Sequence, residues 1–176
     1  MNGPLALPGD ADPHHAVWHL LESVTDPEIP VVSLREIGVL RDIRVGAQGL
    51  EVVITPTYSG CPAMTQMRDD VLNTLAHAGY QATVVTQLAP AWTTDWMTPQ
   101  ALDKLKAYGI APPARSHTPS NGKVVQLAKR TPTPVVPCPQ CLSVKTTETS
   151  HFGSTACKAM YKCLDCWEPF DYFKPY

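Results

Sequence analysis

Six cysteines are the residues of this 176-residue sequence that are best suited to bind metal or to act as nucleophiles. Four of them form two Cys-x-x-Cys pairs, Cys138 with Cys141 and Cys163 with Cys166, and 21 residues separate the pairs. Four thiolates can occupy the tetrahedron that zinc prefers, and backbone amides in so tight a turn can stabilise the charge on sulfur. The spacing predicts a structural metal, which we expect to be zinc. An iron–sulfur cluster remains the alternative.

Cys61 directly precedes an expected helix, within the run Ser59-Gly60-Cys61-Pro62. The unpaired amides and positive dipole at a helix start favour a thiolate, so Cys61 is the best reactive residue. Asp26 and Glu28, on a proline-bounded loop, are candidate neighbours as ligands or proton acceptors, and turn formation or helix capping is their alternative role. Since no histidine base is evident for a nucleophile, we assign no catalytic residue and expect no independent catalysis.

Cys157 is left over from the two pairs. It is interpreted either as a small residue packed beneath a strand, as most free cysteines are, or as an extra thiolate. In the second role it would hold an iron–sulfur cluster transiently or serve as an alternative metal ligand.

Prolines divide the chain, because they cluster with serine and glycine in one stretch that cannot form a helix or a central strand. We therefore predict an α+β domain over residues 1–110, a Pro-rich linker over 111–136 and a four-cysteine metal-binding tail over 137–176. The tail is too short to bury a sufficient core without a metal.

Hydrophobic periodicity and turn residues predict the elements that position these side chains in the first domain. Asp12 and Pro13 would open a helix that ends near Thr25, and Ser33 with Glu36 would form a capping box. Strands over 39–45 and 50–55 with a loop at 46–49, a helix from Pro62 to Gly79, a strand over 80–88 and a helix from Thr98 to Gly109 would follow. This α-β-β-α-β-α order predicts a small three-stranded sheet with helices on one face, followed by a zinc-ribbon-like module.

Composition limits the classes of function. Hydrophobic residues form 44% of the chain and charged residues 17%, so a packed core is expected. A net charge of −2 argues against a protein whose whole surface binds nucleic acid, and we expect the tail lysines (Lys145, Lys158, Lys162 and Lys174) to be solvated near an anionic metal centre. Without a secretory signal or a long apolar stretch at the amino terminus, we expect a cytoplasmic protein with no membrane partner.

Four segments of the first domain resemble the iron–sulfur assembly domain of the MIP-eighteen-like family over about residues 14–110: Asp26–Pro30, Gly38–Val39, Thr55–Pro62 and Trp92–Met97. The tail, with its cysteine pairs and its ending from Cys166 to Lys174, resembles the phenylacetate-degradation subfamily, the PaaD-type accessory subunit of phenylacetyl-CoA epoxidase systems. Both halves and their order agree with that subfamily.

The resemblance implies an accessory factor that helps to mature the iron–sulfur or di-iron centres of the oxygenase and reductase components in aerobic phenylacetate catabolism. It implies that Cys61 handles a transient iron–sulfur cluster, and that the partners are the epoxidase components, notably the iron–sulfur reductase. One cysteine cannot supply the four ligands of a cluster, so a homodimer, a partner or small thiols would have to complete it.

Two other functions stay open. A zinc-ribbon adaptor would bind a protein, or with less support a nucleic acid, through the tail, and Cys61 would then be dispensable. A cysteine-dependent CoA-thioester hydrolase would use Cys61 as its nucleophile and would need a nearby base.

Overall fold

The computed structural model describes residues 13–47, 49–114 and 135–176, which form two compact units. The first unit comprises the chain up to Tyr108 together with Tyr176, and the second runs from Gly109 to Pro175. Most of the expected linker lies outside the described residues, so its bounds remain a prediction. Within the described residues no helix combines the length and the apolar character needed to cross a membrane.

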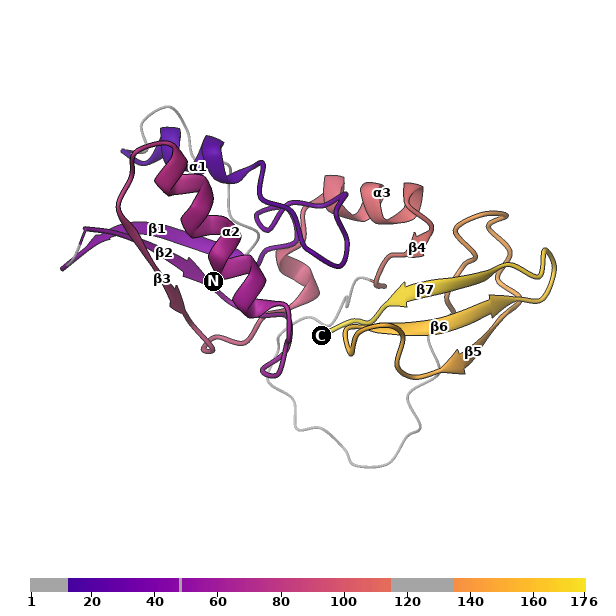
Figure 1. Ribbon diagram of the computed structural model, residues 1–176. Helices are drawn as coiled ribbons and strands as arrows, with labels where there is room; N and C mark the ends of the chain where they lie inside the picture. The colour runs from indigo at the N-terminus through magenta and orange to yellow at the C-terminus, as the bar shows by residue number, and fades with distance from the viewer. Residues whose placement is uncertain (1–12, 48, 115–134) are drawn as a thin grey trace, which may run out of the picture. The chain divides into compact units, whose positions relative to one another are not determined.

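The first unit is built on a three-stranded sheet in the order β1-β2-β3 (Figure 1). Its strands are β1 (Leu40–Gly46), β2 (Gly49–Ile54) and β3 (Ala82–Thr86). The first two pair antiparallel, as expected for a hairpin, whereas β2 and β3 are parallel. A parallel pair needs a long crossover, and α2 (Met64–His77) provides it. The hairpin loop is shorter than predicted, because pairing extends to Gly46 opposite Gly49.

Helices α1 (His15–Leu21) and α2 lie on the same face of this sheet (Figure 1), which confirms the α+β class. The expected apolar face of α2 is buried at Met67, Val71 and Leu75. The helix ends as predicted, because Gly79 adopts the positive φ of 82° that follows many helix ends. The predicted Asp12 cap of α1 lies outside the described residues.

Local capping agrees with the sequence at two further places. The Ser33 amide donates to the Glu36 carboxylate at 2.8 Å and the Glu36 amide donates to the Ser33 hydroxyl at 3.1 Å, which is a complete capping box. Thr98 caps α3 (Pro99–Ala107) by accepting a hydrogen bond from the Ala101 amide at 3.1 Å. Both patterns involve neighbours three residues apart, so they form wherever the turn forms.

Gly38 holds the backbone of Trp96 close to the start of β1. Its φ is +78°, and a Cβ placed on it would lie 2.7 Å from the Trp96 Cβ and 2.9 Å from the Trp96 carbonyl oxygen. Trp96 belongs to the short 3-10 helix η1 (Thr94–Trp96) and is 3% exposed. Only a glycine fits both the backbone conformation and the space.

Gly38→Ala is therefore expected to destabilise the first unit more than Gly79→Ala. Both glycines have a positive φ, but nothing lies within 4 Å of a Cβ at Gly79. Gly79→Ala should cost only the conformational term of about 1–2 kcal/mol, and Gly38→Ala should add about 1–3 kcal/mol of overpacking. Urea unfolding followed by tryptophan fluorescence measures both, and equal losses would contradict the contact with Trp96.

The second unit is a four-stranded sheet in the order β4-β7-β6-β5. Its strands are β4 (Ile110–Ala111), β5 (Thr146–Ser150), β6 (Lys158–Cys163) and β7 (Pro169–Phe173). Ile110 and Ala111 pair in parallel with β7, so these two residues join the tail's sheet although the sequence placed them at the end of the first domain and in the linker. A small core covers this sheet: Ala111, Val136, Cys138, Ala159, Tyr161, Cys163, Phe170 and Tyr172.

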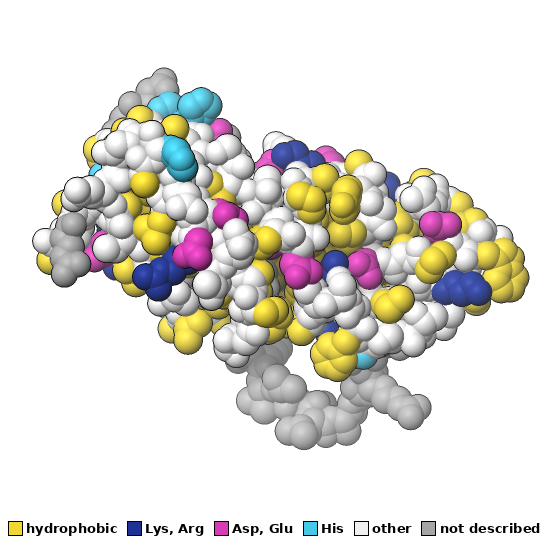
Figure 2. Space-filling view, in the orientation of Figure 1, with side chains coloured by type: hydrophobic (Ala, Val, Ile, Leu, Met, Phe, Trp, Pro, Cys, Tyr) yellow, Lys and Arg dark blue, Asp and Glu magenta, His cyan; other side chains and the backbone are white. Residues whose placement is uncertain are grey.

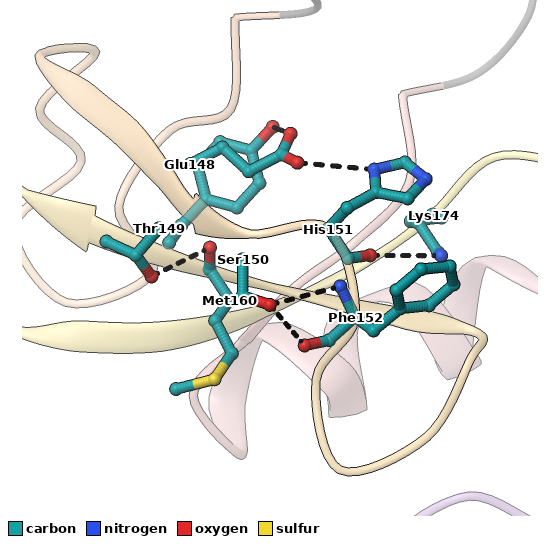
Figure 3. A network of polar contacts seen from close by, with 8 residues as sticks. Glu148, Thr149, Ser150, His151, Phe152, Met160 and Lys174 are labelled. Atoms are coloured by element: carbon teal, nitrogen blue, oxygen red, sulfur yellow. Dashed lines mark hydrogen bonds and ion pairs between the residues drawn. The ribbon is translucent and has the colours of Figure 1, made fainter.

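Polar contacts shape the hairpin between β5 and β6 (Figure 3). The Glu148 carboxylate pairs with His151 at 3.2 Å and accepts a hydrogen bond from the Tyr161 hydroxyl at 3.2 Å. Burial and the Glu148 carboxylate raise the pKa of Tyr161 to about 12, which keeps this hydroxyl protonated as a donor. Lys174 donates to the His151 carbonyl at 3.2 Å and so ties the loop to the end of the chain's last strand.

Candidate functional site

The structure brings together the four cysteines that the sequence paired as metal ligands. The sulfur atoms of Cys138, Cys141, Cys163 and Cys166 all lie within 4.8 Å of one another. Cys138 and Cys166 are 3.7 Å apart, and Cys141 and Cys163 are 3.6 Å apart, sulfur to sulfur. Four sulfurs at about 2.3 Å from a tetrahedral zinc would be separated by roughly 3.8 Å. The sulfur positions therefore fit a four-thiolate metal ion.

The two cysteine pairs adopt similar turns. Leu142, directly after Cys141, and Trp167, directly after Cys166, both have a positive φ, of 62° and 66°. Bulky residues rarely adopt this conformation, so both turns are held by their surroundings. The Leu142 amide donates to the Cys138 carbonyl at 2.9 Å, which closes the first turn. In the second turn the Cys166 amide points at the Cys163 sulfur, 3.5 Å away.

That amide hydrogen bond has an electrostatic effect. It stabilises negative charge on sulfur and lowers the pKa of Cys163 to about 6. Metals bind the thiolate and not the thiol. The same group of sulfurs raises the pKa of Cys141 and raises that of Cys166 to about 12, so the protein by itself favours the thiolate form at Cys163 and opposes it at these two cysteines.

Asp165 links the two turns on their outer side. It accepts hydrogen bonds from the Ser143 hydroxyl at 2.6 Å and from the Lys145 ammonium at 3.2 Å. These bonds lower the pKa of Asp165, which keeps its carboxylate ionised. The Leu164 amide also donates to the Lys145 carbonyl at 2.8 Å. The pairs are therefore positioned by protein contacts as well as by any metal.

Cys157 does not belong to this group of sulfurs. It directly precedes β6, whereas Cys163 ends that strand, and six residues of extended chain span roughly 20 Å. The Thr155 hydroxyl lies 3.1 Å from the Cys157 sulfur. Cys157 is partly buried, which agrees with a packed residue. The structure therefore gives no support to a fifth ligand at the four-cysteine site, and another thiolate role stays a prediction.

Cys61 lies in the loop between β2 and α2, three residues before the helix begins. The loop is closed by the Cys61 amide, which donates to the Tyr58 carbonyl at 3.2 Å, and by the Met64 amide, which donates to the Cys61 carbonyl at 3.4 Å. The Cys61 side chain is partly exposed.

The carboxylates of Asp26 and Glu28, the candidate neighbours from the sequence, both act electrostatically on the Cys61 thiol. Asp26 is buried, and one of its oxygens accepts hydrogen bonds from the Glu28 amide at 2.8 Å and the Ile29 amide at 2.9 Å. Asp26 thus shapes the turn, which is the alternative role that the sequence gave it. Its role as a ligand or proton acceptor beside Cys61 stays a prediction.

The sequence predicted that Cys61 favours the thiolate, whereas its pKa is shifted in the opposite direction. Burial raises the pKa of the Cys61 thiol, and the negative charges of Asp26 and Glu28 raise it further. Hydrogen bonds to the sulfur from the Ala63 amide and the Tyr58 side chain act in the opposite direction and are outweighed. The helix start therefore does not produce a free thiolate. Tyr58 is a site residue that sequence reasoning missed, although it stands in the same Thr55–Pro62 segment.

Three lysines of the tail form ion pairs or contacts with aromatic rings inside the second unit. Lys158 is buried and pairs with Asp171 at 3.1 Å, which corrects its expected solvated position. The Lys162 and Lys174 ammonium groups lie 4.8 and 4.5 Å from the ring centroids of Trp167 and Phe152. On the face shown in Figure 2, side chains of both charges are interspersed with hydrophobic ones. A single basic surface suited to nucleic acid is not formed by these lysines.

Comparisons with known proteins match the two parts of the chain to two families. Residues 14–86 match the family described as an iron–sulfur cluster assembly protein, and residues 122–174 match the PaaD zinc beta ribbon domain. The D subunit of a "Putative 1,2-phenylacetyl-CoA epoxidase" from Escherichia coli (strain K12) is 46% identical over 165 residues, which cover 91% of this chain and 92% of that protein. The chain thus combines an iron–sulfur cluster assembly domain with a zinc ribbon. It belongs to the family of phenylacetyl-CoA epoxidase D subunits.

Two solved structures are similar to the chain in part. A domain of unknown function from Bacillus anthracis is 25% identical, covers 52% of this chain and 90% of its own, and has a TM-score of 0.48. A conserved hypothetical protein from Thermotoga maritima is 22% identical, covers 60% of this chain and 98% of its own, and has a TM-score of 0.42. At these scores the likeness adds nothing to the assignment, which rests on the sequence relatives.

Proposed function

We propose that this chain is a non-catalytic accessory factor that helps to mature the iron–sulfur or di-iron centres of a phenylacetyl-CoA epoxidase. One observation carries the proposal. Cys61 stands in the segment that matches iron–sulfur cluster assembly proteins, and the carboxylates of Asp26 and Glu28 act electrostatically on its thiol. We place the iron–sulfur reductase of the epoxidase first among the recipients, since the proposed cargo is a cluster.

The donor set suits transient handling of iron. Cys61 offers a soft sulfur donor and the two carboxylates offer hard oxygen donors, and iron accepts both kinds. Because the thiol has a raised pKa, it is protonated at neutral pH and must release its proton when iron binds. One sulfur from each chain leaves a cluster short of ligands. Binding should therefore be weak, which suits a factor that passes its cargo on.

The tail would serve as a docking module whose fold depends on zinc. Cys138, Cys141, Cys163 and Cys166 would hold the ion, whose contribution is structural. Four large hydrophobic side chains that stand close to these cysteines in the sequence are exposed: Leu142, Val144, Leu164 and Trp167. Exposed apolar groups that gather at one place are typical of protein-binding surfaces. We propose that this end of the tail contacts the epoxidase components.

The two alternative functions have less support. A hydrolytic cysteine requires an activated thiolate, whereas the pKa of Cys61 is raised. Binding of nucleic acid requires unneutralised basic groups, whereas Lys145 and Lys158 pair with Asp165 and Asp171. An adaptor for proteins remains compatible with the exposed apolar groups of the tail and is contained in the proposal.

Anaerobic reconstitution with iron and sulfide tests the role of Cys61. We expect iron and sulfide to bind to wild type and to Cys157→Ser, and to be lost in Cys61→Ser, with zinc content unchanged in all three. The measurements are elemental analysis and the visible absorption spectrum. Iron uptake by Cys61→Ser equal to that of wild type would overturn the proposal.

A further inference from the structure

A cavity of about 640 Å³ lies in the first unit. Its walls come from the turn at residues 31–38, the start of β1, η1 and the first turns of α3. Cys61, Asp26 and Glu28 do not line it. Small-molecule sites commonly measure about 300–1,000 Å³, so the cavity has the size of a ligand site.

Arg41 enters this cavity because β1 contains a β-bulge. Leu40 and Ile43 are both buried, although a regular strand would place residues three apart on opposite faces. The pairing shifts between Leu40 and Asp42, so Arg41 is the extra residue. Bulges redirect side chains and often lie beside functional sites. Here the bulge places the Arg41 guanidinium 3.5 Å from the centroid of the Trp96 ring.

Arg41 has no ion-pair partner among the residues that the structure describes. Its Nη1 is buried and finds no hydrogen-bond acceptor in the described part of the chain. Burial also lowers the pKa of this guanidinium, because a buried charge is less well hydrated. A partly buried cation without a counter-charge is unfavourable in free energy, because it has lost hydration and gained no partner. An anion bound in the cavity would supply that partner.

A second arginine in the same wall is equally well fixed. The Arg35 side chain is 9% exposed, its guanidinium lies 4.8 Å from the centroid of the Trp18 ring, and its Nη1 donates to Glu22 at 2.7 Å. Its Nη2 is buried and has no hydrogen-bond acceptor among the described residues. Arginines stacked on aromatic rings are held in one orientation. Both guanidinium groups are therefore prepared for an acceptor that the described chain does not supply.

The charges around the cavity select the kind of anion. Glu22 neutralises Arg35, and Glu36 neutralises Lys104 at 2.6 Å, which leaves the single positive charge of Arg41. One excess charge matches a monoanion, and the two glutamates in the wall would repel a dianion such as phosphate. A guanidinium binds a planar carboxylate through two parallel hydrogen bonds. Val31, Pro99 and Trp96 add apolar surface for the rest of the ligand.

We propose that this cavity binds a small carboxylic acid with an apolar body, with Arg41 as the main partner of the carboxylate and Arg35 as a second donor. The proposal is independent of the cluster-handling role of Cys61. Either site could be present without the other, because they share no side chain.

Calorimetric titration of the full chain tests this proposal. The probes are benzoate and hexanoate, their neutral amides benzamide and hexanamide, and inorganic phosphate. We expect at least one of the two carboxylates to bind saturably and at least about tenfold more tightly than its amide, since the charge-assisted bidentate bond is lost in the amide. Equal affinity of acid and amide, tighter binding of phosphate, or no saturable binding of either acid would overturn the proposal.

Arg41→Gln should weaken carboxylate binding at least about tenfold. Arg44→Gln is the matched control, because Arg44 lies on the same strand, is exposed and pairs with Glu51 outside the cavity. The Arg44→Gln variant should bind the carboxylate with the affinity of wild type. Circular dichroism checks the fold, and Arg41→Lys replaces Arg41→Gln if the latter does not fold. In the nitrogen–proton NMR spectrum of wild type, the Arg Nε–H resonance that the Arg41 variant lacks should shift when the acid is added. An unchanged affinity for the acid in a folded Arg41 variant would overturn the assignment.

Discussion

Cys163→Ser is expected to release the metal from the tail and to unfold the sheet β4-β7-β6-β5. The second unit spans only Gly109–Pro175 and has a small core, in which Cys138 and Cys163 are themselves buried. Units of this size seldom fold on core burial alone. A structural zinc contributes about 10–16 kcal/mol to folding in comparable small domains, which is more than such a core supplies. Loss of the metal should therefore unfold this unit and leave the first unit intact.

Hydrogen exchange followed by mass spectrometry can observe the two units separately. In Cys163→Ser, or in wild type treated with a zinc chelator, protection should disappear from β5, β6 and β7 and persist in β1, β2 and α2. Cys157→Ser is the matched control, since Cys157 lies in the same unit but outside the sulfur group. It should retain one metal ion per chain by elemental analysis. Full protection of the tail after complete removal of metal would show that the ion is not structural.

Cys61→Ser is expected to abolish maturation of the recipient enzyme while the fold is retained. The side chain is partly exposed and precedes α2, so removal of its sulfur leaves the helix contacts intact. Serine, however, does not provide a thiolate for iron. In cells that supply the epoxidase components but lack the native copy of this chain, epoxidase activity with the variant should fall to the level measured without the chain.

The control for that experiment separates loss of function from loss of protein. Cys157→Ser should support full epoxidase activity, and both variants should match wild type in amount and in thermal unfolding. The iron content of the purified recipient distinguishes failed maturation from a failed interaction within the epoxidase complex. A recipient with full iron content in the presence of Cys61→Ser would remove the thiol from the mechanism.

Local features followed from the sequence because neighbouring residues determine them. The Ser33–Glu36 capping box, the Thr98 cap and the helix end at Gly79 all formed as predicted. Each involves a hydrogen bond or a backbone preference within a few residues. The four-cysteine site was also predictable, since the pair spacing restricts how the sulfurs can converge and the structure brings them within 4.8 Å.

Features that depend on distant segments required the tertiary structure. The pKa of Cys61 is raised because burial and the Asp26 loop, far away in sequence, outweigh the local hydrogen bonds. Lys158 is buried because β7 brings Asp171 to it, and β4 joins the tail's sheet through pairing with β7. The cavity around Arg35 and Arg41 depends on a bulge and on two tryptophan rings from other elements. Sequence alone thus determined the caps, the grouping of the four cysteines and the resemblance to the family. Packing decided the charge states and the cavity, because desolvation and pairing depend on which distant groups meet.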